Sequence, residues 1–129
     1  MVTRSIDALL AEARQHIERL SPHAASQRAA DGALLIDIRP AQQRREHGSL
    51  PQALCIERNV PEWRLDPSSP HRIAQVTDHE RCVIVVCQQG YASSLAAASL
   101  RALGYVHAAD LDGGFDAWEA AGLPVELVG

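Results

Sequence analysis

The chain has 129 residues, of which 47% are hydrophobic and 22% are charged. A chain of this length can bury roughly two-thirds of its unfolded surface in one domain, so it needs neither disulfides nor a metal to fold. The apolar content excludes a disordered chain, and the net charge of −4 gives no electrostatic footprint for general nucleic-acid binding. All 12 basic residues are arginine, so any cationic site must use Arg or His.

The cysteine count and the hydropathy pattern indicate a cellular setting. Three cysteines, an odd number, argue against a closed disulfide framework. Residues 1–20 carry charges every few positions and lack the apolar run of a secretory signal. No stretch approaches the roughly 18 apolar residues that span a bilayer. We therefore expect a cytoplasmic protein without membrane attachment, whose thiols stay reduced.

The N-terminal region predicts a helical extension, residues 1–30, in front of a main domain at residues 31–129. Apolar residues recur at helical spacing over residues 5–20, which predicts one amphipathic helix. We expect its apolar stripe to pack on the protein's own body, and a dimer contact is the alternative. Ser21 then has the character of an N-cap before Pro22, which predicts a second, short helix.

The main domain alternates between apolar runs and segments of helical composition. Short runs rich in apolar and β-branched residues are typical of strands buried on both faces. Strands that alternate with helices predict an α/β fold with a parallel sheet covered on both sides. The predicted strands are residues 33–38, 53–56, 82–87 and 106–111, and the predicted helices are residues 41–47, 94–103 and 115–121, with a turn of helix near Trp63.

The segment that leaves the strand at residues 82–87 carries the candidate chemistry. In open parallel sheets, ligands bind beyond the carboxyl ends of the strands. Here Cys87 ends the strand, a short glycine-containing loop follows, and a helix begins at once. Backbone N–H groups of such a loop form an anion nest, and the helix adds its positive end. A Cys87 thiolate at the floor of the nest would be stabilised as a nucleophile, and a buried structural cysteine is the alternative.

Four sequence blocks between residues 33 and 126 resemble the rhodanese family. The segment Cys87-Gln88-Gln89-Gly90-Tyr91-Ala92 resembles that family's active-site loop, often C-x-x-G-x-x, which starts at a strand-ending cysteine. Asp37 and Arg39 match the D-x-R ending of its first strand. Residues 48–53 (GSLPQA) resemble G-H-I-P-G-A, and residues 111–125 are similar to the signature L-x-G-G-x-x-x-W-x-x-x-G-x-P-V.

The resemblance implies a rhodanese-like five-stranded parallel sheet with helices on both faces and a sulfurtransferase mechanism that needs no cofactor. Cys87 would take sulfur from a thiosulfate-like anion as a persulfide and pass it to a thiophilic acceptor, such as a small or protein thiol. A catalytically silent binding module of the same fold is the alternative. The backbone N–H groups that would hold the anionic persulfide are those of Gln88, Gln89, Gly90, Tyr91, Ala92 and Ser93.

The chain departs from the family pattern inside the loop. Many members place Arg or Lys there, whereas this loop has no cationic residue, so help in binding an anion must come from the backbone or from outside the loop. Ser49 stands where the family usually has His, and Gln52 where it usually has Gly. Related phosphatases and arsenate reductases have a C-x5-R loop, and Ser93 at the Arg position counts against that chemistry. The candidate outside cations are Arg39, Arg44, Arg45, Arg58 and Arg64.

The remaining polar and thiol residues have more ordinary interpretations. We expect Asp37 to pair with Arg39 rather than act as a catalytic acid. Cys55 and Cys82 are predicted to be buried small hydrophobes, and a resolving role for Cys55 is the alternative. Because side chains alternate along a strand, Cys82 and Cys87 should point to opposite faces of the sheet.

The aromatic residues and histidines complete the predictions. Tyr91 is expected at the pocket mouth, because it lies in the loop itself. Trp63 and Trp118 are expected in the core or packed against loops, with the pocket mouth as the alternative for Trp63. The six histidines lack metal-ligand spacing, so no metal site is predicted. We expect a monomer or a weak homodimer.

Overall fold

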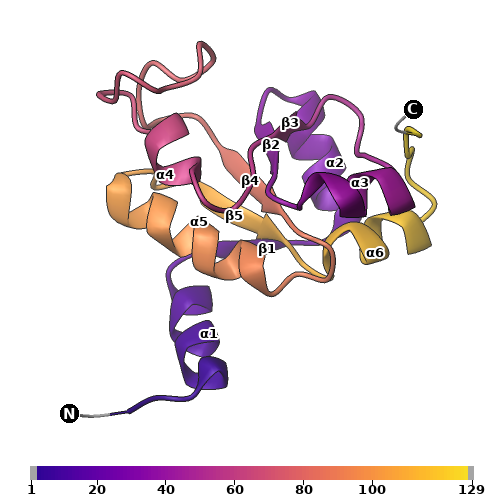
Figure 1. The fold of residues 1–129 in the computed structure, drawn as a ribbon, viewed down its shortest axis with the longest axis horizontal. Helices are drawn as coiled ribbons and strands as arrows, with labels where there is room; N and C mark the ends of the chain where they lie inside the picture. The colour runs from indigo at the N-terminus through magenta and orange to yellow at the C-terminus, as the bar shows by residue number, and fades with distance from the viewer. Residues whose placement is uncertain (1–2, 128–129) are drawn as a thin grey trace.

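The sheet of the computed structural model, which describes residues 3–127, has five parallel strands with helices on both faces (Figure 1). The strand order is β1-β5-β4-β2-β3, so β4 is the central strand and the predicted fold class is confirmed. The strands are β1 (Glu18–Leu20), β2 (Leu34–Asp37), β3 (Leu54–Cys55), β4 (Val83–Val86) and β5 (Ala108–Leu111). The helices are α1 (Ile6–Gln15), α2 (Pro22–Ala30), α3 (Ala41–His47), α4 (Pro61–Arg64), α5 (Ala92–Leu103) and α6 (Gly114–Ala120).

The central strand β4 is buried on both faces because its side chains are all apolar. Val83 and Val85 belong to the core cluster under α5, whereas Ile84 and Val86 belong to the cluster under α2 and α6. Cys87 continues the first series, and Cys82 packs against the second. The two thiols therefore lie on opposite faces, as the alternation predicted.

The N-terminal segment differs from the prediction. The helix α1 begins after Ser5, whose Oγ accepts a hydrogen bond from the Ala8 amide at 3.0 Å, but it ends at Gln15. Residues 18–20 form β1, which pairs with the edge of β5. The helical spacing of the apolar residues continues through Leu20, but the free edge of β5 provides hydrogen-bond partners for an extended backbone. The predicted helix over residues 5–20 is therefore too long, and residues 1–30 are more than a helical extension.

The helix α1 packs against α5 below the sheet in Figure 1. Its Leu10 and Ala13 are buried, whereas Ile6 and Leu9 are exposed. Part of the apolar stripe thus covers the protein's own body, as expected. Within residues 3–127, no helix has both the length and the apolar character needed to cross a membrane.

The loop between α3 and β3 contains a turn in which Gln52 adopts the left-handed backbone conformation. Gln52 has a φ of 65°, and it is the one non-glycine residue with positive φ among residues 3–127. The glycine usual at this position adopts such a backbone without strain, so Gln52 retains the turn at a steric cost. Ser49 exchanges two backbone hydrogen bonds of 2.8 Å with Glu126, which ties this loop to the C-terminal segment.

Candidate active site

Cys87 lies just beyond the carboxyl end of the central strand, at the floor of the loop that leads into α5. Its Sγ accepts hydrogen bonds from the backbone N–H of Gly90 at 3.1 Å and of Ser93 at 3.3 Å. The side chain is only 8% exposed. Amide dipoles that point at a sulfur atom stabilise negative charge on it, so this geometry suits a thiolate.

A pocket of about 320 Å³ is lined by Cys87 and opens between the loop, the end of β2 and Arg58. Tyr91 is 61% exposed and lines the pocket, which agrees with its expected place at the mouth. The lining mixes apolar groups with side-chain amides, because Gln88 and Gln89 also contribute to it. The pocket has room for a small anion and for part of a larger sulfur acceptor.

Three further amides of the loop are free to bind an anion. Gln89, Tyr91 and Ala92 line the pocket, and within the described residues 3–127 their backbone N–H groups donate to no protein acceptor. All three residues are exposed, so solvent or a bound anion can supply the acceptors that these N–H groups lack within the protein. These donors add to the two that already point at the sulfur of Cys87.

On the β2 side, Asp37 and Arg39 form a fully buried ion pair, as expected from the sequence. Arg39 Nη2 donates to Asp37 Oδ2 at 2.8 Å, and both side chains have 0% exposure. Arg39 also donates to the Gly48 carbonyl at 2.8 Å and to Gln88 Oε1 at 2.9 Å. Its guanidinium carbon lies 4.3 Å from the ring centroid of Phe115. The guanidinium of Arg39 thus already donates to protein acceptors, and it holds Gln88, the first residue after Cys87.

On the β5 side, a second buried carboxylate supports the loop from behind. Asp110 Oδ2 accepts hydrogen bonds from Ser93 Oγ at 2.8 Å and from Ser94 Oγ at 2.7 Å. Arg19 Nε donates to Asp110 Oδ1 at 3.0 Å. The sequence reasoning missed Asp110, for which the one signal was a carboxylate inside an apolar strand. Ser93 therefore uses its N–H for the Cys87 sulfur and its hydroxyl for Asp110.

Two arginines from the N-terminal segment reach the carbonyl oxygen of Gly90. Arg14 Nη2 donates to it at 2.9 Å and Arg19 Nη2 at 2.8 Å. Burial opposes the charge of Arg19, but its hydrogen bond and Coulombic attraction to Asp110, and its attraction to Asp112 and Cys87, raise its pKa above the ordinary value. These arginines were missed because residues 5–20 were expected to form a continuous helix packed on the body.

The arginines outside the loop that were named from the sequence are not free to bind an anion in the Cys87 pocket. Arg58 lines the pocket but pairs with Glu62 at 3.2 Å, and Arg39 is held by Asp37. Arg44 donates to the backbone carbonyl of Arg39 and Arg64 to that of His71. Arg45, like Arg44 and Arg64, does not line this pocket.

Paired glycines allow α6 to pack against the base of the loop. The Phe115 amide donates to the Cys87 carbonyl at 2.9 Å, and a Cβ on Gly114 would lie 2.5 Å from that same oxygen. Gly90 has a φ of +89°, and a Cβ on it would lie 2.8 Å from the Gly113 nitrogen. Glycine at these positions therefore permits contact between backbones and sets the shape of the loop.

The predictions that Cys55 and Cys82 are buried small hydrophobes are wrong. Cys55 is exposed and Cys82 is half-buried. Cys55 is exposed because β3 is a two-residue strand at the sheet edge, and it lines a different hollow from that of Cys87.

Trp63 on α4 is 58% exposed and does not line the Cys87 pocket. Trp118 is buried, and its Nε1 donates to the Pro124 carbonyl at 2.8 Å.

Comparisons of the sequence and the fold with known proteins point to one family. The model of the rhodanese-like domain family matches residues 21–121. The thiosulfate sulfurtransferase GlpE of Actinobacillus pleuropneumoniae serotype 3 is 36% identical over 108 residues, covering 83% of this chain and 91% of that protein. The GlpE of Ectopseudomonas mendocina is 32% identical over 103 residues, with coverage of 80% and 85%.

Two solved structures share the fold. A protein of unknown function from Rhodopseudomonas palustris, described as a possible tyrosine phosphatase, matches with a TM-score of 0.88 and 31% identity, over 98% of this chain and 97% of that one. The polysulfide-sulfur transferase homodimer of Wolinella succinogenes matches with a TM-score of 0.74 and 24% identity, over 95% and 87% of the two chains.

Proposed function

The chain belongs to the rhodanese-like family, and we propose that it is a sulfurtransferase that carries sulfane sulfur as a persulfide on Cys87. The observation that carries the proposal is the pair of loop amides, of Gly90 and Ser93, that point at the Cys87 sulfur. The thiosulfate sulfurtransferases that the chain matches over most of their length support the reaction class.

The first half-reaction forms the persulfide. The Cys87 thiolate attacks the outer sulfur of thiosulfate, a new S–S bond forms to Cys87, and the old S–S bond breaks. Sulfite leaves with the electron pair of that bond, so the total charge is unchanged. The product is an anionic persulfide whose terminal sulfur lies above the original thiolate, among the loop amides.

The second half-reaction returns the enzyme to its thiolate. A thiophilic acceptor, such as cyanide or a thiolate, attacks the terminal sulfur, and Cys87 leaves as the thiolate. With cyanide the product is thiocyanate, and with a thiolate it is a new persulfide. We propose a small or protein thiol as the cellular acceptor, in the cytoplasm, with the chain acting as a monomer or weak homodimer and needing no cofactor.

The loop amides are the groups that stabilise the anion in this scheme. The terminal sulfur of the persulfide would enter the pocket where the N–H groups of Gln89, Tyr91 and Ala92 have no protein acceptor among residues 3–127. Such fixed dipoles need no reorganisation when charge arrives, so they stabilise the anion more than mobile water does. This support explains how a loop without a cationic side chain can hold a charged intermediate.

Phosphatase chemistry is less well supported, although one similar structure is described as a possible tyrosine phosphatase. A phosphoryl group, whose negative charge is shared by three oxygens, is best held by a free arginine at the end of the loop. Here that position is Ser93, whose hydroxyl donates to Asp110. The arginines that line the pocket, Arg39 and Arg58, are paired with Asp37 and Glu62.

The test is the intact mass of the protein after incubation with thiosulfate. We expect wild type to gain the mass of one sulfur atom and to lose it when cyanide is added. Cys87→Ser should gain none, whereas Cys55→Ser, which removes the exposed thiol, should behave as wild type. Equal sulfur uptake by Cys87→Ser and wild type would refute the proposal. Wild type that gains no sulfur from either thiosulfate or polysulfide would favour the silent binding module.

A further inference from the structure

We propose that Arg14 and Arg19 are positioning residues for the active-site loop. By holding the Gly90 carbonyl on the side of α1 and β1, they direct the Tyr91 N–H toward the anionic sulfur, and Arg14 supplies the cationic charge that the loop lacks. The part of this inference that concerns sulfur rests on the proposed function, whereas the effect on Cys87 does not.

The planarity of the peptide bond links the two sides of the loop. In a trans peptide, the C=O of one residue and the N–H of the next point in opposite directions. No peptide bond among residues 3–127 is cis. The Gly90 oxygen accepts hydrogen bonds from both arginines, so the Tyr91 N–H points away from them. Tyr91 lines the Cys87 pocket, and within residues 3–127 its N–H has no protein acceptor.

Polarisation strengthens the donor as well as orienting it. Two guanidinium groups on one carbonyl draw electron density toward the oxygen, which makes the N–H of the same peptide a stronger donor. The charge of Arg19 is balanced by Asp110 and Asp112. Arg14 instead contacts the Ser94 hydroxyl and the Tyr91 ring, and it forms no ion pair with any carboxylate among residues 3–127. Arg14 therefore contributes net positive potential to the loop.

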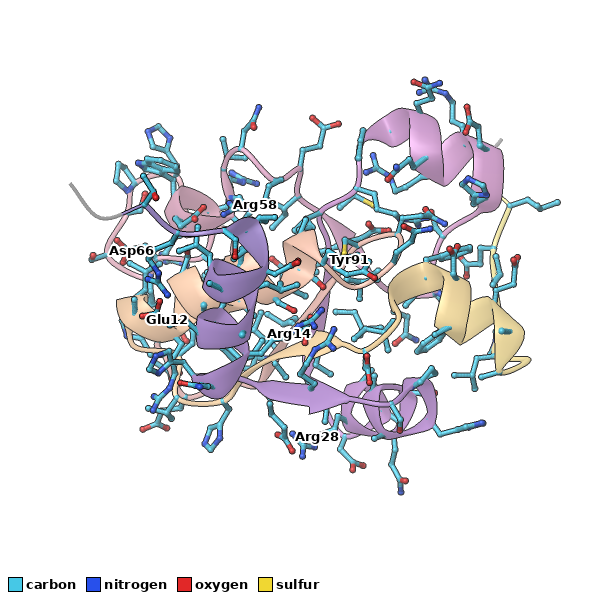
Figure 2. All side chains as sticks on the ribbon, turned by 90° about the horizontal axis from the view of Figure 1, so that it is seen from below. Glu12, Arg14, Arg28, Arg58, Asp66 and Tyr91 are labelled. Carbon is cyan, nitrogen blue, oxygen red and sulfur yellow. The ribbon has the colours of Figure 1, made fainter. Side chains whose placement is uncertain are left out.

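The break between α1 and β1 places both arginines on the same oxygen. In an uninterrupted helix, residues five apart point about 140° away from each other, so Arg14 and Arg19 could not converge. Because α1 ends at Gln15 and β1 begins at Glu18, Arg14 approaches from the helix and Arg19 from the strand. Figure 2 shows Arg14 beside the loop that carries Tyr91, and the Arg14 guanidinium carbon lies 5.7 Å from that ring's centroid.

The first experiment measures the electrostatic potential at Cys87 without using its activity. The rate constants for alkylation by iodoacetate, an anion, and by iodoacetamide, which is neutral, are measured for the Cys87 peptide by mass spectrometry, so that Cys55 and Cys82 do not contribute. We expect Arg14→Gln to lower the ratio of the iodoacetate rate constant to the iodoacetamide rate constant about three- to tenfold. Arg14→Lys should restore most of it. Arg4→Gln, which removes a cation that lies just before the same helix, is the matched control and should leave the ratio unchanged.

The second experiment follows the Tyr91 amide directly. In Cys87→Ser, which cannot form a persulfide, thiosulfate titrated into ¹⁵N-labelled protein should shift the Tyr91 amide proton downfield. The shift should be smaller in Cys87→Ser/Arg14→Gln at the same occupancy. In the enzyme with Cys87, Arg14→Gln should raise the KM for thiosulfate more than it lowers kcat.

The outcomes separate this inference from the proposed function. An unchanged alkylation ratio in Arg14→Gln, an equal change in Arg4→Gln, or a Tyr91 amide that stays in place while other loop amides report thiosulfate binding would each overturn the positioning role. Thermal unfolding of each variant shows whether it is folded. If Arg14→Gln does not fold, Arg19→Lys, which keeps the positive charge beside Asp110, provides a second variant. A protein that takes up no sulfur, but whose ratio falls as expected, would refute the sulfurtransferase and retain the role of Arg14.

Discussion

Two aspartate–arginine pairs flank the central strand of this protein, one on each side. Asp37 and Arg39 lie at the end of β2, whereas Asp110 in β5 pairs with Arg19 in β1. In both pairs the arginine also contacts the loop that follows Cys87, where Arg39 binds the side chain of Gln88 and Arg19 the carbonyl of Gly90. The loop is thus held from both sides of the central strand β4.

The two pairs differ in how they are compensated. The Asp37–Arg39 pair has 0% exposure at both side chains, and most donors that reach Asp37 come from Arg39 itself. In the other pair, Arg19 is 22% exposed and Asp110 also accepts from the Ser93 and Ser94 hydroxyls. A buried charge with one partner depends wholly on that partner, whereas a shared carboxylate keeps other donors when one is lost. The β2 pair should therefore dominate stability, and the β5 pair should affect the loop more.

The largest effect is expected from breaking the β2 pair. Arg39→Met keeps an apolar chain over Phe115 but leaves Asp37 buried without its cation, which should cost about 3–5 kcal/mol of unfolding free energy. Urea unfolding at neutral pH measures this loss. The double variant Asp37→Asn/Arg39→Met removes the stranded charge and should be more stable than Arg39→Met alone. A double variant as unstable as the single one would show that the charge is not the cause.

The contrast between the pairs also explains what could be predicted from the sequence. Asp37 and Arg39 are two positions apart at a strand end, so their side chains leave on the same side and their pairing is visible in the local pattern. Arg19 and Asp110 are 91 positions apart and meet only because β1 adds to the edge of β5. The helical spacing of the apolar residues runs through residues 18–20, so it predicts a longer helix and does not reveal the edge strand.

The same reasoning applies to Cys87 and the other cysteines. Cys87 was found because it ends an apolar strand before a glycine-containing loop and a helix, which is a local pattern. The exposure of Cys55 could not be predicted, because it depends on β3 lying at the sheet edge. The order of the strands is set by packing between distant segments. The composition of β3, which has two residues, carries no information about that order.

An intermediate effect is expected from the matching variant of the β5 pair. Arg19→Met should cost about 1–3 kcal/mol, because Asp110 keeps two hydroxyl donors and the site is partly open to water. Urea unfolding of Arg19→Met beside Arg39→Met measures the difference. In addition, Arg19→Met should slow alkylation of Cys87 by iodoacetate, since Gly90 loses one of its donors. A loss of stability equal to that of Arg39→Met would contradict the role given to Ser93 and Ser94.

The smallest effect is expected from a third ion pair, between Glu18 on the same strand as Arg19 and Arg28 on α2, which lies in solvent. The Nη2 of Arg28 lies 2.8 Å from Glu18 Oε2, and both side chains are more than 40% exposed. The hydrogen bond from Arg28 lowers the pKa of Glu18 below its usual 4.5, against a small opposing effect of burial, and the charges of Arg28 and His107 add to the lowering. Exposed pairs of this kind contribute about 0.5 kcal/mol or less.

Because the folded-state pKa of Glu18 is the lower one, its contribution is present above pH 4.5 and is lost as pH falls through the folded-state value. Glu18→Gln should therefore unfold at a slightly lower urea concentration than wild type at pH 7, and the two midpoints should converge in acid and in high salt. A difference that persists in acid, or that reaches the cost of Arg19→Met, would mean that burial does not rank these three pairs. If the expected order holds, the stabilising effect of each pair follows the exposure of its charges, and β1 contributes to the loop through Arg19 rather than through its surface charges.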